Sequence, residues 1–368
     1  MTRRDDGVAR PFVALILGVA VLVGSLTAGV VLADNPTTTS SPTSTTTTTT
    51  VPRERPQAGW AVAADSGRGV MVDVTTVRVG AASFRVARFR ARATLLRWHV
   101  GLGDPAAWSR APADAAPSID WTVEGPPGVL AVFNGGFKQH DSPGGAMADG
   151  LTLEAPVRGR MTIAVDAAGH WAMGVWGAAG FPPAHFRPVS YRQNLGPLVA
   201  GGAPTPAASA PVTTWGSPLG GVPAEPRTGL GVDRNGNLLF VATMSAVLPI
   251  QLARALLRAG AVSAMELDIN PYWPILGVAL RARHHPAGGY AIGLAGSQHS
   301  PTVYDTGWIR DFFVVLAEPS TWGCEWTGPG LHAGAVPQPQ PLRPVGRCAG
   351  VGSAVAGTRA TTTAGPGR

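Results

Sequence analysis

Lysine, cysteine and charged residues in general are scarce in this sequence, and each scarcity excludes a class of protein. Lys138 is the single lysine, so arginine supplies nearly all of the 29 cationic residues, which outnumber 22 acidic ones and set the net charge at +7. The arginines are scattered, without the basic block that marks a nucleic-acid-binding arm. Charged residues make up 14% of the chain and hydrophobic residues 45%, a balance typical of a folded domain. We therefore expect no nucleic-acid partner.

Motifs of several enzyme and metal-binding classes are also absent. The chain has no Gly-x-Ser-x-Gly, phosphate-binding loop, dinucleotide fingerprint or His-Glu-x-x-His. The two cysteines have no histidine cluster near them, and the adjacent His284 and His285 cannot easily point at one metal. His140 and Asp141 could assist catalysis or only cap a loop. The sequence therefore predicts no metal site and no cofactor.

An uncharged segment near the N-terminus, residues 11–33, is long enough to cross a hydrocarbon core of about 30 Å as a helix. Residues 1–10 contain three arginines and are expected to stay in the cytoplasm. The alternative is a secretory signal peptide that is cleaved near residue 33. Both interpretations place the later residues outside the cytoplasm, either on a single-pass membrane protein or as a secreted one.

The rest of the chain divides into a spacer, a domain and a tail. Residues 34–57 are rich in Thr, Ser and Pro and predict a solvated linker, and residues 58–323 predict one domain. Residues 324–368 form a Gly- and Pro-rich tail. Outside the cytoplasm a disulfide between Cys324 and Cys348 is the default, with two unrelated thiols as the alternative.

Within the domain, alternating or continuous apolar runs predict many short strands. They cover residues 69–79, 84–100, 129–133, 161–165, 171–176, 229–233, 237–242, 261–267, 290–294 and 312–316. Asn235-Gly236 between two apolar runs predicts a hairpin. The spacing of apolar residues predicts a helix over 248–259, with Gly260 at its C-terminal end.

The strand, helix and strand between residues 237 and 267 indicate a right-handed crossover. We therefore expect an α+β fold, a single domain with a mixed, largely antiparallel sheet core and a few packed helices. An N-terminal transmembrane helix is expected to precede it.

The first candidate site is the sequence Asn134-Gly135-Gly136-Phe137-Lys138, directly after a predicted buried strand. Two glycines let the backbone approach a ligand closely and offer N–H donors to an anion. Asn134 adds an amide, and a lysine in an arginine-rich protein suggests a selected ammonium. The alternative is an ordinary tight turn with a solvated lysine.

Two further segments carry polar groups at strand ends. Arg227 and Thr228 open a predicted strand and could grip a phosphate, although a surface ion pair is the simpler interpretation. Glu266, Asp268 and Asn270 alternate along another strand, so they are expected on one face, with Leu267 and Ile269 facing a core. Paired carboxylates repel, which raises one pKa and suits a general acid, whereas a solvent-facing strand edge is the alternative.

The order of these pieces resembles the phosphodiester glycosidase family, the N-acetylglucosamine-1-phosphodiester alpha-N-acetylglucosaminidase-like domains. The resemblance spans about residues 128–316 and rests on Phe133-Asn134-Gly135-Gly136-Phe137, Asn194-Leu195-Gly196-Pro197-Leu198, Arg227-Thr228-Gly229-Leu230-Gly231-Val232-Asp233, the 248–260 helix and Leu267-Asp268. It implies an α+β domain that hydrolyses a sugar-1-phosphodiester. The site residues it implies are Asn134, Gly135, Gly136, Arg227, Thr228 and Asp268.

One segment departs from the family pattern. The family continues its aspartate into Asp-Gly-Gly-Gly-Ser, whereas residues 268–272 read Asp-Ile-Asn-Pro-Tyr. The backbone donors of three glycines are therefore replaced by Asn270 and a stiff, aromatic loop.

The sequence predicts a hydrolase of a glycosyl phosphodiester in the cell envelope. Asp268 or Glu266 is expected to act as general acid and base, while the other orients the sugar or water. Arg227, Lys138 and the glycine amides are expected to hold the phosphate. The alternatives are a non-catalytic protein that binds an anionic glycan on the same scaffold, and a purely structural tethered domain.

Overall fold

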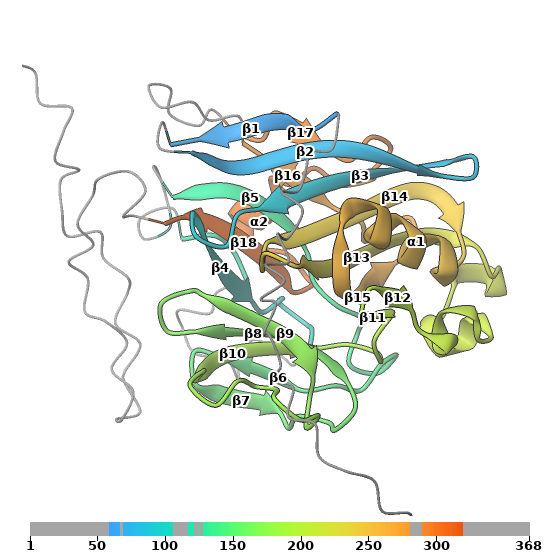
Figure 1. Cartoon of the computed structure of the whole chain (residues 1–368), viewed down its shortest axis with the longest axis horizontal. Coiled ribbons are helices and arrows are strands. Elements are labelled where there is room, and N and C mark those ends of the chain that lie inside the picture. The colour runs from blue at the N-terminus through green and yellow to red at the C-terminus, as the bar shows by residue number, and fades with distance from the viewer. Residues whose placement is uncertain are drawn as a thin grey trace, which may run out of the picture. The chain divides into compact units, whose positions relative to one another are not determined.

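The computed structural model describes residues 59–66, 69–105, 117–120, 124, 128–279 and 289–318, which form three β-sheets (Figure 1). Sheet A has the strand order β1-β2-β3-β14-β13-β15-β11-β12. Its strands are β1 (Ala61–Asp65), β2 (Val70–Val79), β3 (Ala82–Phe89), β11 (Val199–Ala200), β12 (Ala203–Pro204), β13 (Glu225–Asp233), β14 (Leu238–Val247) and β15 (Ala261–Ile269).

The other two sheets have five strands each. Sheet B has the order β17-β16-β5-β18-β4 and consists of β4 (Thr94–His99), β5 (Val129–Asn134), β16 (Leu276–Val278), β17 (Ile292–Gly293) and β18 (Phe312–Ala317). Sheet C has the order β7-β6-β10-β8-β9 and consists of β6 (Ala146–Ala148), β7 (Leu151–Glu154), β8 (Met161–Asp166), β9 (Trp171–Val175) and β10 (Pro188–Gln193).

Helices are few in the described part of the chain. They are α1 (Pro249–Ala259), the single turn α2 (Val303–Thr306) and the 3-10 turns η2 (Pro206–Ser209), η3 (Val212–Trp215) and η4 (Leu219–Gly221). All pairs of neighbouring strands in the described ranges are antiparallel. The predicted α+β fold with a mixed sheet is therefore wrong, and the domain is a mainly antiparallel β structure.

The physical reason lies in the connection through α1. This helix links β14 to β15, and both strands run antiparallel to β13, which lies between them. The two linked strands therefore share a direction without touching each other, so the predicted crossover creates no parallel pair. The core is made mainly by packing sheet on sheet, and helices form no complete layer.

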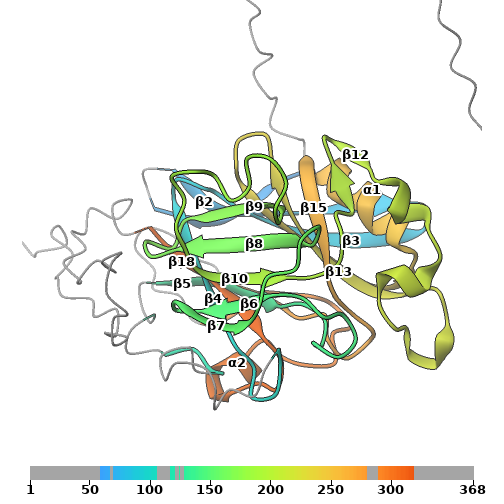
Figure 2. The same ribbon diagram turned by 90° about the horizontal axis from the view of Figure 1, so that it is seen from below.

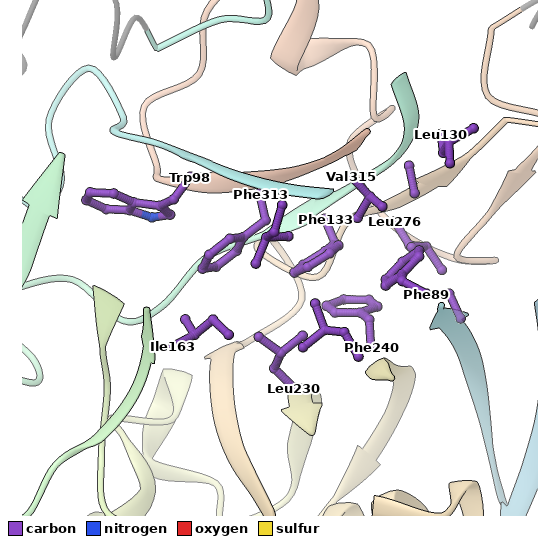
Figure 3. Packing of buried hydrophobic residues seen from close by; sticks show 14 of the residues in the cluster. Phe89, Trp98, Leu130, Phe133, Ile163, Leu230, Phe240, Leu276, Phe313 and Val315 are labelled. Carbon is purple, nitrogen blue, oxygen red and sulfur yellow. The ribbon is translucent and has the colours of Figure 1, made fainter. Parts of the chain in front are cut away.

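The principal core lies where side chains of all three sheets meet. It contains Phe89, Leu230 and Phe240 from sheet A, Trp98, Phe133 and Phe313 from sheet B, and Ile163 from sheet C (Figure 3). The Phe133 ring lies 5.7, 4.7 and 5.2 Å from the rings of Phe89, Phe240 and Phe313, centroid to centroid. Such contacts add to the free energy gained from burying apolar area. Because Phe133 directly precedes Asn134, this packing fixes the end of β5.

A second core fills the opposite face of sheet A, where α1 packs on β13, β14 and β15 (Figure 2). Its buried helix residues are Leu252, Ala255 and Leu256. The Gln251 side chain accepts a hydrogen bond from the Leu248 N–H at 2.9 Å, which satisfies a free donor at the helix start. Gly260 ends the helix at φ 105°, a conformation that suits glycine.

The predicted hairpin after residue 229 is confirmed as β13 and β14. Its turn contains Gly236 at φ 79°, and the Asp233 carboxylate accepts hydrogen bonds from the N–H groups of Asn235 and Asn237 at 2.8 and 2.9 Å. Most other predicted strands also form, although the run 290–294 supplies only the two residues of β17.

Several predictions lie outside the described residues. These are the segment 11–33, the linker, the tail with Cys324 and Cys348, and the histidines 284 and 285. Among the residues that are described, no helix has the length and apolar character needed to cross a membrane.

Candidate functional site

The end of β5 is the point at which hydrogen bonds connect sheets A and B. Asn134 is buried, and its amide nitrogen donates to Thr228 Oγ1 at 2.9 Å and to the Gly135 carbonyl at 3.1 Å. Its amide oxygen accepts from the Ile275 N–H at 3.2 Å. Thr228 in turn donates to the Asp268 carbonyl at 2.7 Å. The structure therefore brings together three of the candidate residues named from the sequence, Asn134, Thr228 and Asp268, from three strands.

The two glycines after Asn134 do bind an anion, but the anion is a side chain of the protein itself. Asp311 Oδ2 accepts from the Gly136 N–H at 3.2 Å, and the Asp311 carbonyl accepts from the Gly135 N–H at 2.8 Å. The same carboxylate oxygen accepts from Arg192 Nε at 2.9 Å and from Trp98 Nε1 at 3.0 Å. The two backbone donors predicted to hold a phosphate are thus occupied.

Close packing requires glycine at the first of these positions. A Cβ atom on Gly135 would lie 2.2 Å from Asp311 Oδ2 and 2.7 Å from the Asp311 carbonyl oxygen. A Cβ atom on Gly136 would lie 3.2 Å from the Arg192 guanidinium, which is tight but not prohibitive. The glycines therefore let β5 approach the start of β18 closely.

Asp268 lies at the centre of the candidate site and is paired with Arg310. Its Oδ2 accepts from Arg310 Nη2 at 2.6 Å, and its Oδ1 accepts from the Ile269 N–H at 2.9 Å. Arg310 Nη2 also donates to the Gly136 carbonyl at 2.7 Å, and Arg310 Nη1 lies 3.3 Å from Asp104 Oδ2. Only 4% of Asp268 and 2% of Arg310 is exposed.

Burial dominates the electrostatics of Asp268. Loss of solvation raises its pKa to about 7, while Arg310 acts in the opposite direction and Asp311 adds to the rise. The carboxyl group therefore exchanges its proton near neutral pH. A group of this kind can act as a general acid or a general base.

Glu266 belongs to a different ion pair. Its Oε1 accepts from Arg227 Nη1 at 2.6 Å, and both side chains are fully buried. Burial raises the pKa of Glu266 to about 7; Arg227 opposes this rise and Asp268 adds to it. Its second carboxylate oxygen has no hydrogen-bond partner among the described residues.

The strand β15 does not keep the simple alternation predicted for it. Glu266 pairs with Gly229 and Ile269 pairs with Arg227, so three steps along β15 oppose two along β13, which is a bulge. As a result Leu267 packs in the principal core, whereas Ile269 packs in the second core on the other face of sheet A. The expectation that Leu267 and Ile269 face one core is therefore wrong. The two carboxylates, expected side by side, bind different arginines.

The Arg227 guanidinium donates its hydrogen bonds to acceptors within the protein. Its Nε donates to the Val247 carbonyl at 2.9 Å, and its terminal nitrogens donate to the carbonyls of Trp215 and Pro223, each at 3.2 Å, besides Glu266. Arg227 thereby ties the segment with the turns η2 to η4 onto sheet A.

Lys138 and Asn270 flank this cluster. Lys138 is partly exposed, and its Nζ lies 5.5 Å from the centroid of the Trp273 ring. The Arg310 guanidinium lies 5.0 Å from the same centroid. Asn270 adopts φ 76°, and its side-chain oxygen accepts from the Leu219 N–H at 3.0 Å, so it shapes the loop that carries Trp273.

Sequence reasoning missed several residues of this cluster. They are Trp98, Asp104, Arg192, Arg310 and Asp311, which contact the predicted site residues or their backbone. Asn194 and Trp273 also contact them and lie in segments that the sequence had singled out without a role at the site. One sequence feature could have drawn attention to two of them, because Arg310 and Asp311 are adjacent opposite charges directly before an apolar strand. The pairing partners lie far away in sequence, so no local pattern connects them.

Comparisons with known proteins give a distant structural likeness. No protein-family model matches the chain, and no curated protein matches it. Among solved structures, a hypothetical protein from Synechocystis is 13% identical with a TM-score of 0.42, over 67% of this chain and 62% of that protein. This chain thus spans less than two thirds of that protein's length. The zebrafish N-acetylglucosamine-1-phosphodiester alpha-N-acetylglucosaminidase catalytic domain, auto-inhibited by its pro-peptide, is also 13% identical with a TM-score of 0.42, over 70% of this chain and 87% of that one.

Proposed function

We propose that this protein hydrolyses a glycosyl phosphodiester, at the site centred on Asp268. The observation that carries the proposal is the chain of hydrogen bonds from Asn134 through Thr228 to the Asp268 backbone, with Arg310 on the Asp268 carboxylate. These hydrogen bonds join three of the segments on which the resemblance to the phosphodiester glycosidase family rests. The prediction for residues 11–33 places this chemistry outside the cytoplasm.

In the proposed reaction Asp268 acts on water. A water molecule attacks the anomeric carbon, the bond from that carbon to the phosphate oxygen breaks, and a phosphate monoester leaves with the electron pair. This leaving group is weakly basic, with a second pKa of about 6, so it needs little help from an acid. Water is a poor nucleophile and needs a base, and the ionised Asp268 carboxylate accepts its proton. Activity is therefore expected to rise with pH through about 7, the pKa of Asp268.

The test is a substitution at Asp268 compared with one at a matched carboxylate. Asp73 is also buried and paired with arginines, at 2.6 Å from Arg88 and 2.7 Å from Arg90, but it lies in β2. The full chain, purified in detergent, is assayed for free sugar released from a panel of sugar 1-(methyl phosphate) diesters. Asp268→Asn is expected to lower kcat by at least about 100-fold, whereas Asp73→Asn leaves kcat unchanged. Equal turnover of folded Asp268→Asn and the parent chain removes Asp268 from the mechanism.

The second candidate function is binding of an anionic glycan without hydrolysis. It is favoured by the ion pair that neutralises Asp268 and by the Pro-aromatic loop after Asn270. A binding protein retains the sugar diester reversibly and releases no sugar from any member of the panel. The same assay therefore separates the two functions.

A further inference from the structure

We propose that Arg310 and Lys138, which lie at the ring of Trp273, are the pair that binds the substrate's phosphate, and that Arg310 exchanges Asp268 for the phosphate on binding. The identity of the anion rests on the proposed function. The presence of an anion site is independent of the proposed function, because it is argued from the hydrogen-bond donors of this cluster that have no acceptor.

The donors selected from the sequence are already used. Four of the five N–H donors of Arg227 are accounted for by Glu266 and three backbone carbonyls. The amides of Gly135 and Gly136 donate to Asp311. Both amide hydrogens of Asn134 are also used within the protein. The Gly135, Gly136 and Asn134 donors cannot bind an anion without breaking a buried hydrogen bond, which costs about 1–3 kcal/mol, and Arg227 has one N–H left beside its buried ion pair with Glu266.

Arg310 retains an unused donor. Its Nε is buried and has no hydrogen-bond partner among the described residues, and the side chain is only 3% exposed. A buried N–H without an acceptor is costly unless something binds it. Lys138 also has no carboxylate within ion-pair distance in the described part of the chain. Both cations lie within 5.5 Å of the Trp273 ring centroid, so two positive charges gather at one indole, and cations of this kind form charge-assisted hydrogen bonds to phosphate oxygens.

The charge balance couples this anion to a proton. Arg310 and Lys138 carry two positive charges, while Asp268 and Asp104 on Arg310 carry two negative ones. Protonation of Asp268 gives these four side chains a net charge of +1 and frees Arg310 Nη2 from its ion pair. An anion bound at this position in turn disfavours the ionised carboxylate. Anion binding and protonation of Asp268 therefore reinforce each other. Because only ionised Asp268 can accept the proton of water, kcat is then expected to rise with pH through a pKa above that of the free enzyme, while kcat/KM rises through about 7.

The other charged groups that face Asp268 keep their partners. Asp311 and Arg192 bind each other at 2.9 Å, and Glu266 binds Arg227 at 2.6 Å. The proton linked to anion binding is therefore assigned to Asp268, the carboxyl group that shares its arginine with the anion.

The probe for the test is inorganic sulfate, a tetrahedral anion whose charge is constant between pH 5 and 9. Its dissociation constant is measured by calorimetry on the full chain in detergent at pH 6 and pH 8. Binding is expected to be about tenfold weaker at pH 8, because Asp268 passes from mostly protonated to mostly ionised around pH 7. Asp268→Asn is expected to remove this pH dependence and to bind sulfate at pH 8 as the parent chain does at pH 6.

Substitutions of the two cations test the assignment. Lys138→Gln and Arg310→Lys are each expected to weaken sulfate binding by about tenfold or more, with thermal unfolding used to show that each variant is folded. The matched control is Arg88→Lys, because Arg88 lies 3.9 Å above the ring of Trp60 and is also paired with an aspartate. Sulfate binding by this control is expected to equal that of the parent chain. If Arg310→Lys does not fold, Lys138→Gln decides alone.

The outcomes separate this inference from the proposed function. Sulfate binding that depends on Lys138 and Arg310, without hydrolysis of any sugar diester, supports the anion site and overturns the hydrolase. Hydrolysis with an unchanged KM and unchanged sulfate affinity in Lys138→Gln overturns the anion site and leaves the hydrolase standing. Sulfate affinity that is the same at pH 6 and pH 8 overturns the exchange of partners by Arg310.

Discussion

Replacing Gly135 by alanine tests the packing that connects β5 to the start of β18. The added Cβ would lie 2.2 Å from Asp311 Oδ2 and 2.7 Å from the Asp311 carbonyl oxygen, so the two segments must separate. Overpacking of this kind costs about 1–3 kcal/mol, and loss of the Gly136 N–H bond to the Asp311 carboxylate adds about 1.5–3 kcal/mol. We expect Gly135→Ala to lower the free energy of unfolding by about 2.5–6 kcal/mol.

Thermal unfolding measures this effect. For a domain of about 250 residues each kcal/mol changes Tm by about 2–4 °C, so Gly135→Ala is expected to lower Tm by about 5–24 °C. Turnover is expected to fall as well, since the Gly135 carbonyl accepts the Asp268 N–H at 3.1 Å.

Two other glycines supply a graded control. At Gly136 the Cβ would meet the Arg192 guanidinium at 3.2 Å, so we expect a loss of about 1 kcal/mol. At Gly196 no atom lies within 4 Å of the Cβ, and alanine is expected to be neutral or slightly stabilising. A Tm for Gly135→Ala within about 2 °C of the Gly196→Ala value would refute the close approach of Gly135 to Asp311.

Further predictions concern the buried carboxyl and hydroxyl groups. Because the folded state raises the pKa of Glu266 to about 7, it retains a proton that the unfolded chain releases; stability is greatest at low pH and is lost as pH rises through 7. Between pH 5 and 8 this group lowers the free energy of unfolding by about 2–3 kcal/mol, and chemical denaturation of Glu266→Gln should show a correspondingly flatter profile. Thr228→Val removes the hydroxyl that joins Asn134 to Asp268 and should cost about 1–3 kcal/mol with a clear loss of kcat, whereas the buried Thr94→Val should leave kcat unchanged. Arg227→Lys should increase hydrogen exchange across residues 206–224 in mass spectrometry, and unchanged exchange there would contradict its role in holding that segment.

The local elements of the domain follow from short stretches of sequence. The hairpin around Gly236 and the helix 249–259 form because turn chemistry and apolar spacing act over a few residues. The apolar run 129–133 similarly predicted a buried strand that ends at Asn134. These features depend on neighbours in the chain, so one sequence is sufficient to place them.

The fold class and the ligands of the site depend on distant pairings. No local pattern shows that β13 inserts between β14 and β15, or that β15 has a bulge between Glu266 and Ile269. The order of the strands depends on which apolar faces pack together, and these faces lie far apart in the sequence and meet only when the chain folds.

The sequence by itself determined that two glycines follow a buried strand, and that a lone lysine stands beside them. Only the tertiary structure decided which anion these glycines bind, because Asp311 lies 175 residues from Gly136 along the chain. It likewise paired Arg227, which the sequence predicted to hold a phosphate, with Glu266, and paired Asp268 with Arg310. A buried charge requires a partner of opposite sign, and the fold alone determines which one is within reach.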